Sequence, residues 1–246
     1  MKNTLKISIL AYVLIQSATA AMAFQTDLQG AWQQVTMQNG AEITRVLLLS
    51  DNHFAWTEYA TTDGAFLSTK GGSWQLENEQ LTFTYEFHTA DTGMVGQSEK
   101  WLAKIEQGEL LLHQNIAGRH LRWEAADQNK TTPLIGAWLM AGRVNNGEIA
   151  RRDTNVPRKT MKILTAGHFQ WIAYNTATKQ FFGTGGGLYT AENGLYTERL
   201  RFFSRDNNRV GMNLEFKFEV HGDDWHHSGN SSSGEPLYEI WARRER

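Results

Sequence analysis

The feature that most constrains the fold of this chain is an internal repeat. Three blocks of the first half recur in the same order in the second half, and the third recurs without a gap. A repeat of this kind indicates two copies of one structural unit. The paired blocks are LQGAW (28–32) with LIGAW (134–138), NHFAWTEY (52–59) with GHFQWIAY (167–174), and GGSWQLENEQLTFTYEF (71–87) with GGLYTAENGLYTERLRF (186–202).

Each unit is predicted to be a separate domain, because about 100 residues is a typical domain size. The first unit is expected to span residues 24–127 and the second residues 134–246. Residues 128–133 are polar and end in a proline, which is typical of a linker.

The hydrophobic pattern within each unit has the period of a β-strand. In the first unit Leu81, Phe83, Tyr85 and Phe87 alternate with polar residues, and similar runs recur between turn signals. Such alternation predicts strands with one face in a core and one face in water. The fold class is therefore predicted to be all-β, as two tandem antiparallel up-and-down barrels, because closing each sheet removes its edges.

The first 23 residues have the pattern of a secretory signal peptide. Lys2 and Lys6 precede a short apolar stretch, and Ala21-Met22-Ala23 fits a signal peptidase site. The apolar stretch is too short to span a bilayer. The sequence contains no cysteine, which excludes a lipoprotein anchor, disulfides and thiolate metal sites. The protein is therefore expected to be periplasmic or secreted, without a membrane span.

Charge and histidine patterns argue against two other classes of partner. The net charge is −2 and no basic stripe is present, so nucleic acid is not an expected partner. HGDDWHH (221–227) gathers histidines and aspartates, but strand alternation scatters them over both faces. A solvated hairpin is therefore favoured over a metal site, and neither a metal nor a cofactor is predicted.

Gly-x-Trp opens the first predicted strand of each unit, as Gly30-Ala31-Trp32 and Gly136-Ala137-Trp138, and this resembles the lipocalin signature. The second unit also resembles the small lipocalin-like, calycin-type domains of secreted bacterial proteins, in GHFQWIAY, GGGLYTAENGLYTE, DDWHHSG and YEIWARR. The resemblance implies a barrel that holds a small ligand, without implying a particular activity. In lipocalins the first-strand tryptophan closes the barrel floor against a basic residue of the last strand, and the resemblance gives that role to Arg243.

The run Gly185-Gly186-Gly187 raises the question of a phosphate-binding loop. Such a loop needs a helix N-terminus or a lysine beyond the glycines. Here a strand, the turn Asn193-Gly194 and a second strand follow instead. The glycines are therefore predicted to form a bend or bulge where a barrel strand turns a corner.

Two glutamates of the second unit fall on the predicted inward face. Glu198 aligns with Phe83 of the first unit, and Glu239 aligns with Leu121. A buried carboxylate has to be paired, hydrated or neutralised, so three interpretations remain open. The glutamates could be structural charges, with Arg243 as the partner of Glu239. They could line a hydrated ligand pocket, or act as acid and base in catalysis.

We predict an exported protein that binds a small polar or amphipathic molecule in the second barrel, with the first barrel better filled. The alternatives are a barrel enzyme, a hydrolase or isomerase that uses the two glutamates, and a scaffold for a protein partner; the enzyme is less favoured. A basic loop over residues 150–159 could overhang the barrel opening. The candidate ligand-binding residues are Glu198, Glu239, Tyr196, Arg243, Trp171 and Tyr189.

Overall fold

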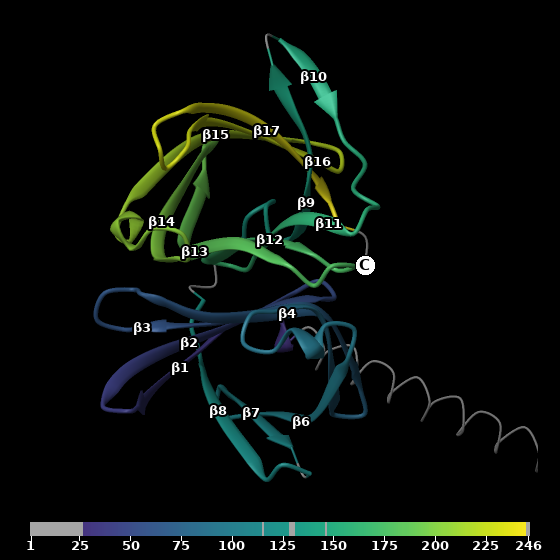
Figure 1. The fold of residues 1–246 in the computed structure, drawn as a ribbon, viewed down its shortest axis with the longest axis vertical. Coiled ribbons are helices and arrows are strands. Elements are labelled where there is room, and N and C mark those ends of the chain that lie inside the picture. The colour runs from purple at the N-terminus through teal and green to yellow at the C-terminus, as the bar shows by residue number, and fades with distance from the viewer. Residues whose placement is uncertain (1–26, 115, 128–130, 146, 245–246) are drawn as a thin grey trace, which may run out of the picture.

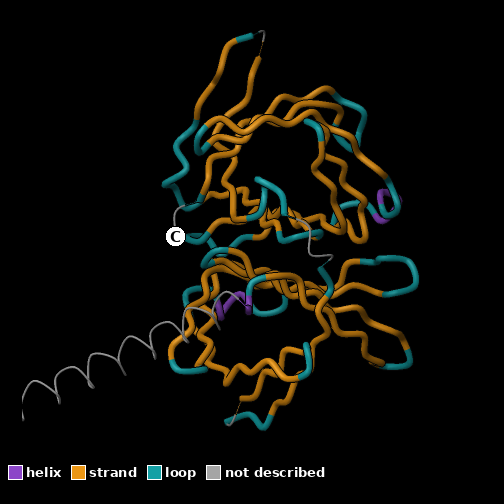
Figure 2. Tube along the Cα trace, turned by 180° about the vertical axis from the view of Figure 1, so that it is seen from behind, coloured by secondary structure: helices purple, strands orange, loops and turns teal. Residues whose placement is uncertain are grey.

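The computed structural model describes residues 27–114, 116–127, 131–145 and 147–244. The signal peptide predicted at residues 1–23 lies outside these residues, as do residues 128–130 of the predicted linker. The described chain is all-β and forms two closed, eight-stranded antiparallel barrels in tandem, which confirms the predicted fold class. One barrel is stacked on the other (Figures 1 and 2).

In the first barrel each strand pairs with its neighbours in sequence, and the last strand pairs back with the first. This order leaves no free sheet edge. A short 3-10 turn, η1 (Thr92–Met94), precedes the sixth strand. The strands are β1 (Gly30–Gln38), β2 (Ala41–Ser50), β3 (His53–Ala60), β4 (Phe66–Glu77), β5 (Gln80–His88), β6 (Ser98–Glu106), β7 (Glu109–Gln114) and β8 (Arg119–Ala125).

The second barrel repeats this order and adds one strand. Its last strand closes onto its first, and the added strand β10 forms a hairpin with β9 that projects beyond the barrel (Figure 1). The turn η2 (Asn207–Arg209) is the counterpart of η1. The strands are β9 (Gly136–Asn145), β10 (Glu148–Arg151), β11 (Arg158–Leu164), β12 (His168–Asn175), β13 (Phe181–Glu192), β14 (Leu195–Phe203), β15 (Asn213–His221), β16 (Asp224–Asn230) and β17 (Pro236–Arg243).

A pair of adjacent glycines makes a β-bulge in each barrel. The register of β13 against β14 shifts between Gly186 and Gly187, and that of β4 against β5 shifts between Gly71 and Gly72. A Cβ atom at Gly187 would lie 2.1 Å from the carbonyl oxygen of Arg199, so the two backbones approach too closely for any other residue. The glycine run therefore forms a bulge, as the sequence predicts.

The bulge reverses the direction of the side chains that follow it. Glu86 is the extra residue in the first barrel and Arg201 is the extra residue in the second. One extra residue shifts the alternation of a strand by one position. Phe87 and Phe202 therefore point out of their barrels. The alternation in the sequence predicts that Phe87 shares the inward face of Phe83 and Tyr85, and that prediction is wrong for this reason.

The two barrels pack against each other through an apolar cluster on their outer faces. The cluster covers strand faces that the alternation pattern assigns to water, because that pattern does not reveal a second packing partner. Its first-barrel members are Ala31, Val46, Leu48, Ala55 and Phe87, and its second-barrel members are Ala137, Met161, Ile163, Ile172 and Tyr174.

Aromatic rings cross this interface in matched pairs. Tyr59 occupies the position in the first unit that Tyr174 occupies in the second, and Phe87 and Phe202 are equivalent in the same way. The contact between the bulge phenylalanine of one unit and the tyrosine of the other is therefore made twice, once in each direction. A third contact joins a phenylalanine of the first unit to the equivalent phenylalanine of the second. The ring centroids are 4.9 Å apart for Phe87 and Tyr174, 5.3 Å for Tyr59 and Phe202, and 6.0 Å for Phe66 and Phe181.

A carboxylate at the end of the first unit, just before the predicted linker, contacts both barrels. Asp127 accepts a hydrogen bond from the backbone N–H of Ala31 at 2.9 Å. On the second barrel it accepts one from the Thr165 hydroxyl at 2.8 Å and one from the backbone N–H of Ala166 at 3.1 Å. His168 Nδ1 lies 3.1 Å from the same carboxylate.

A second carboxylate, that of Glu86 in the bulge of the first barrel, also joins the two barrels. Arg244 of the second barrel donates a hydrogen bond to Glu86 at 2.5 Å, and the Tyr174 hydroxyl donates to the same carboxylate. Burial alone would raise the pKa of Glu86, but the charge and hydrogen bond of Arg244, together with Tyr174, outweigh it and lower that pKa. Both side chains of this ion pair are mostly buried.

We expect Glu86→Gln to lower the free energy of unfolding by about 3 kcal/mol, since it leaves the Arg244 guanidinium buried without a counter-charge. Urea denaturation at pH 7 measures this change. The pKa of Glu86 is lowered in the folded protein, so its contribution is present above the unfolded pKa, near 4.5, and is lost as the pH falls through the folded value. The difference between wild type and variant should therefore shrink on acidification.

Glu106→Gln is the matched control, because Glu106 pairs with Lys104 on the open surface. Its effect should stay within about 0.5 kcal/mol. An equal effect of the two variants would show that the Glu86–Arg244 ion pair stabilises the protein no more than an ion pair on the open surface.

Candidate functional site

The second barrel contains a cavity of about 540 Å³. Its inner wall is formed by side chains that point into the barrel, and its mouth lies beside the β10 hairpin, the chain that leads into β11 and the loop between β16 and β17. Its lining includes five cationic and three carboxylate side chains. These are Arg143, Arg152, Arg158, Arg205 and Lys162, and Glu198, Glu235 and Glu239.

A buried ion pair lies in the inner wall of this cavity. Lys162 on β11 donates a hydrogen bond to Glu198 on β14 at 2.8 Å, and each side chain is only 5% exposed. The Tyr196 hydroxyl donates to the same carboxylate oxygen at 3.0 Å. Glu198 therefore has two protein partners, and its charge is balanced inside the barrel.

The Lys162 ammonium is also surrounded by aromatic rings. Its nitrogen lies about 5 Å from three ring centroids, at 5.1 Å for Tyr196, 5.0 Å for Trp225 and 5.1 Å for Trp241. The negative faces of aromatic rings attract a cation in such positions. Glu198 and this aromatic surround together replace the water that the ammonium loses on burial.

The sequence reasoning missed Lys162, although a signal for it was present. Lys162 occupies the position that Leu47 holds in the first unit, since Leu47 pairs with Trp56 and Lys162 pairs with the equivalent Trp171. Leu47 is fully buried in the first core. The comparison of units that identified Glu198 in place of Phe83 would therefore also have identified its partner.

Glu239 lies nearer the mouth and has different partners. Arg143 approaches it at 3.5 Å, and His227 Nδ1 lies 3.7 Å away, which is too long for a hydrogen bond. Burial on its own would raise the pKa of Glu239, but His227 and the positive charges of Lys162 and Arg143 lower it. Of the interpretations left open for the glutamates, the pairing of Glu239 with Arg243 is wrong, because the two side chains lie at opposite ends of the barrel.

Arg243 lies at the closed end of the barrel. Its guanidinium stacks 4.0 Å from the ring of Trp138 and donates a hydrogen bond to the carbonyl of Ile135 at 2.5 Å. This is the contact between first-strand tryptophan and last-strand arginine that the lipocalin resemblance implies. Arg243 does not line the cavity.

The three predicted aromatic residues are divided between the cavity and the core. Trp171 lines the cavity wall. Tyr189 and Tyr196 are buried in the core cluster, where the Tyr189 hydroxyl donates to the carbonyl of Thr165 at 2.6 Å. Among the predicted site residues, Glu198, Glu239 and Trp171 are thus brought together at the cavity, and Tyr196 touches it only through Glu198.

His227 is buried inside the barrel, which differs from the solvated hairpin that we expected for HGDDWHH. It alternates inward with Trp225 on β16, while His226 faces outward. Neither ring nitrogen of His227 has a hydrogen-bond partner in the described chain. Burial, followed by the charge of Lys162, lowers the pKa of His227 to about 4, so the ring is neutral at pH 7.

Three arginines at the mouth, Arg152, Arg158 and Arg205, donate hydrogen bonds to backbone carbonyls. Arg158 stacks 3.7 Å from the ring of Phe182, and Arg205 lies 5.6 Å from the ring of Trp171. Burial lowers the pKa of Arg152 and Arg158, and neighbouring guanidinium groups lower each of them further. None of the three forms an ion pair with a carboxylate within the described ranges. The mouth is therefore an electropositive surface with aromatic sides.

The first barrel is filled where the second is hollow. Phe83 and Trp123 are fully buried in its core, with Leu121 packed against them. Its rim carries a smaller hollow of about 380 Å³, where Glu99 pairs with Arg119 at 2.8 Å. Glu99 and Arg119 thus balance each other's charge at this rim.

Two further features of the described residues bear on the predicted partners. No helix there is long and apolar enough to cross a membrane. No cluster of three or more histidine, cysteine, aspartate or glutamate side chains is arranged there to hold a metal ion.

Comparison with known proteins gives little further information. No family matches the chain, and no curated protein matches it. Among solved structures, the chain is similar to the crystal structure of the Cpx pathway activator NlpE from Escherichia coli, with 11% identity and a TM-score of 0.26, over 89% of this chain and 93% of that chain. A similarity this distant supports no conclusion about function.

We expect Glu198→Gln to lower the free energy of unfolding by about 3 to 5 kcal/mol, because it leaves the buried Lys162 ammonium without its counter-charge. The double variant Lys162→Leu/Glu198→Phe carries the residues of the first barrel. It should recover most of that loss, since an apolar pair often replaces a buried ion pair at little cost. Urea denaturation of the two variants measures both effects. A double variant less stable than Glu198→Gln would contradict this account.

The lowered pKa of His227 predicts a dependence of stability on pH. Between the unfolded value of 6.5 and the folded value of about 4, the unfolded chain binds a proton that the folded chain does not. The free energy of unfolding should therefore fall on acidification, by up to about 1.4 kcal/mol per pH unit for this group. His227→Asn should remove that part of the slope between pH 6 and pH 5, whereas His226→Asn should leave it unchanged.

Proposed function

We propose that this protein is an exported, lipocalin-like small-molecule-binding protein that holds an amphipathic anion in its second barrel. The observation that carries the proposal is the cavity of about 540 Å³, with three arginines at its mouth that form no ion pair with any described carboxylate. A cavity of this size suits a small organic ligand. Export, to the periplasm or the medium, rests on the signal peptide predicted at residues 1–23.

The charges favour an acidic ligand over the hydroxyl or amine that the inward glutamates alone suggest. Glu198 is already paired with Lys162, and Glu239 is already approached by Arg143. The guanidinium groups of Arg152, Arg158 and Arg205 donate to backbone carbonyls but form no ion pair with a carboxylate in the described chain. Arginine forks bind carboxylate, sulfonate or phosphate groups through charge-assisted hydrogen bonds.

The apolar part of such a ligand would lie deeper, against the rings. Trp171, Phe203, Phe216 and Trp241 line the same cavity and offer flat apolar surface. The acidic group would then stay at the mouth, beside the arginines and close to solvent. This orientation avoids burying a second charge next to the Lys162 ion pair.

The two alternative functions have weaker support. A general acid at neutral pH needs a raised pKa, whereas the pKa of Glu239 is lowered and Glu198 is held by an ammonium. A scaffold without a ligand would be expected to fill its second barrel as it fills its first.

A pair of fluorescent probes tests the proposal. 1-Anilinonaphthalene-8-sulfonate is an amphipathic anion, and N-phenyl-1-naphthylamine is its neutral analogue without the sulfonate. We expect Arg205→Gln to weaken binding of the sulfonate about tenfold, because it removes one charge-assisted hydrogen bond. Binding of the neutral probe should change less than twofold. Fluorescence titration measures both affinities.

Arg122→Gln, on the outer surface of the first barrel, is the control variant and should bind both probes as wild type does. Equal affinities for the sulfonate in wild type and Arg205→Gln would contradict the proposed site. So would a wild-type protein that binds the neutral probe as tightly as the sulfonate.

A further inference from the structure

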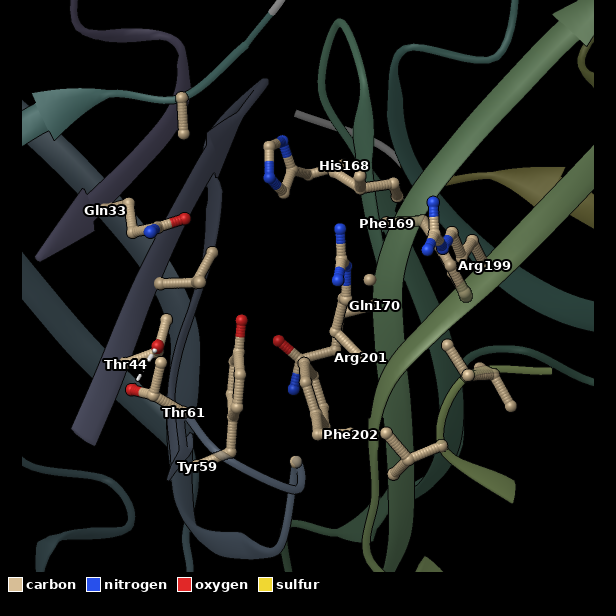
Figure 3. A pocket seen from close by; sticks show the side chains of 18 of the residues that line it. Gln33, Thr44, Tyr59, Thr61, His168, Phe169, Gln170, Arg199, Arg201 and Phe202 are labelled. Carbon is tan, nitrogen blue, oxygen red and sulfur yellow. Dashed lines mark hydrogen bonds between the residues drawn. The ribbon is translucent and has the colours of Figure 1, made fainter. Parts of the chain in front are cut away.

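A second hollow, of about 500 Å³, lies between the two barrels. It is separate from the cavity inside the second barrel, and of the two linings only Leu200 is common to both. One wall comes from β1, β2 and β3 of the first barrel, and the other comes from β12, β13 and β14 of the second (Figure 3). Neither barrel alone forms this hollow.

Polar side chains from both barrels surround one open space in this hollow. Figure 3 shows Gln33 and Tyr59 on the first-barrel side and His168 and Arg201 on the second-barrel side. The ring of His168 also contacts Asp127, since its Nδ1 lies 3.1 Å from that carboxylate. Below them Tyr59 stacks on Phe202 with an interplanar angle of 26°. The hollow thus has hydrogen-bonding groups on both walls and this aromatic pair at its lower end.

The barrels are locked together at one end of the hollow. A Cβ atom at Gly64 would lie 2.3 Å from the carbonyl oxygen of Arg201 and 2.6 Å from the Val210 side chain. The Asn207 side-chain amide also donates to the carbonyl of Asp63 at 3.3 Å. The hollow is therefore a fixed feature of the packed interface.

A comparison of the two bulge residues, Glu86 and Arg201, indicates that the hollow binds an anion. Arg201 is the extra residue of the bulge in the second barrel, as Glu86 is in the first. Glu86 is met by Arg244 of the opposite barrel. Arg201 also faces the opposite barrel, yet in the described part of the chain it forms no ion pair, and neither does Arg199 two residues earlier. A bulge often re-aims a side chain beside a functional site.

We propose that the hollow between the barrels binds a small aromatic anion. Its acidic group, a carboxylate or a phosphate, accepts hydrogen bonds from Arg201. The ligand is thus to Arg201 what Arg244 is to Glu86, the equivalent bulge residue of the first barrel. Arg199 adds a second positive charge at the edge, and the ring of the ligand lies against Tyr59 and Phe202. Asp63 is the carboxylate in the lining, and its Oδ1 is occupied by the backbone N–H of Ala65 at 3.0 Å.

Isothermal titration calorimetry of the full protein with benzoate, phenyl phosphate and inorganic phosphate tests this site. Arg201→Gln changes the exposed side chain of Arg201, and Arg122→Gln on the outer surface of the first barrel is the control. Arg205→Gln distinguishes the two cavities, because Arg205 lines only the one inside the second barrel. We expect benzoate, phenyl phosphate or both to bind, with at least a tenfold weaker affinity in Arg201→Gln and less than a twofold change in Arg122→Gln. Which probe binds more tightly decides between a carboxylate and a phosphate ligand. Thermal unfolding of each variant confirms that it is folded.

The remaining outcomes overturn this proposal. Loss of binding in Arg205→Gln but not in Arg201→Gln would place the probes in the barrel cavity, which supports the proposed function and removes the second site. Binding of inorganic phosphate as tight as that of phenyl phosphate would show that the Tyr59–Phe202 pair contributes nothing to binding. No binding of either aromatic anion at millimolar concentration would also refute the site, without bearing on the sulfonate experiment for the barrel cavity.

Discussion

The close approach of two backbones at Gly72 and Gly187 determines most of what is distinctive in this structure. At each position a neighbouring strand passes so near that a side chain has no room, and the ladder takes up one extra residue. That residue turns the end of the strand outward. Phe87 and Phe202 thereby become interface residues, and Glu86 and Arg201 face the opposite barrel. The contact between barrels and the hollow beside it both follow from this local change of direction.

The interiors of the two barrels show how one architecture accommodates different chemistry. The first barrel is filled by apolar side chains such as Leu47 and Phe83, and its stability follows from burial. The second has Lys162 and Glu198 at the equivalent positions, with aromatic rings around the ammonium. A buried ion pair is weak evidence for stability, because desolvation offsets much of its attraction.

Much of the fold could be predicted from the sequence, because the repeat and the two-residue alternation act locally and consistently. The same patterns gave the inward positions of Glu198 and Glu239. They could not give the direction of Phe202, since a bulge is set by which backbones meet and one extra residue reverses the alternation. They also could not give the partners of the charges. Arg243 and Glu239 share a strand, yet the barrel places one at the closed end and the other near the mouth, so Arg143 from β9 is the residue that meets Glu239.

The reciprocal ring contacts of the interface have a consequence for how the two halves differ. Phe87 meets Tyr174 as Phe202 meets Tyr59, and Phe66 meets its own counterpart Phe181, which is the pattern of an isologous interface with a local twofold axis. In a symmetric homodimer the same residue would stand at both bulges, so two glutamates or two arginines would face across the interface. Joining the subunits in one chain removes that restriction. Glu86 and Arg201 have opposite charges at symmetry-related positions, so one of these positions can hold the barrels together while the other remains open to a ligand.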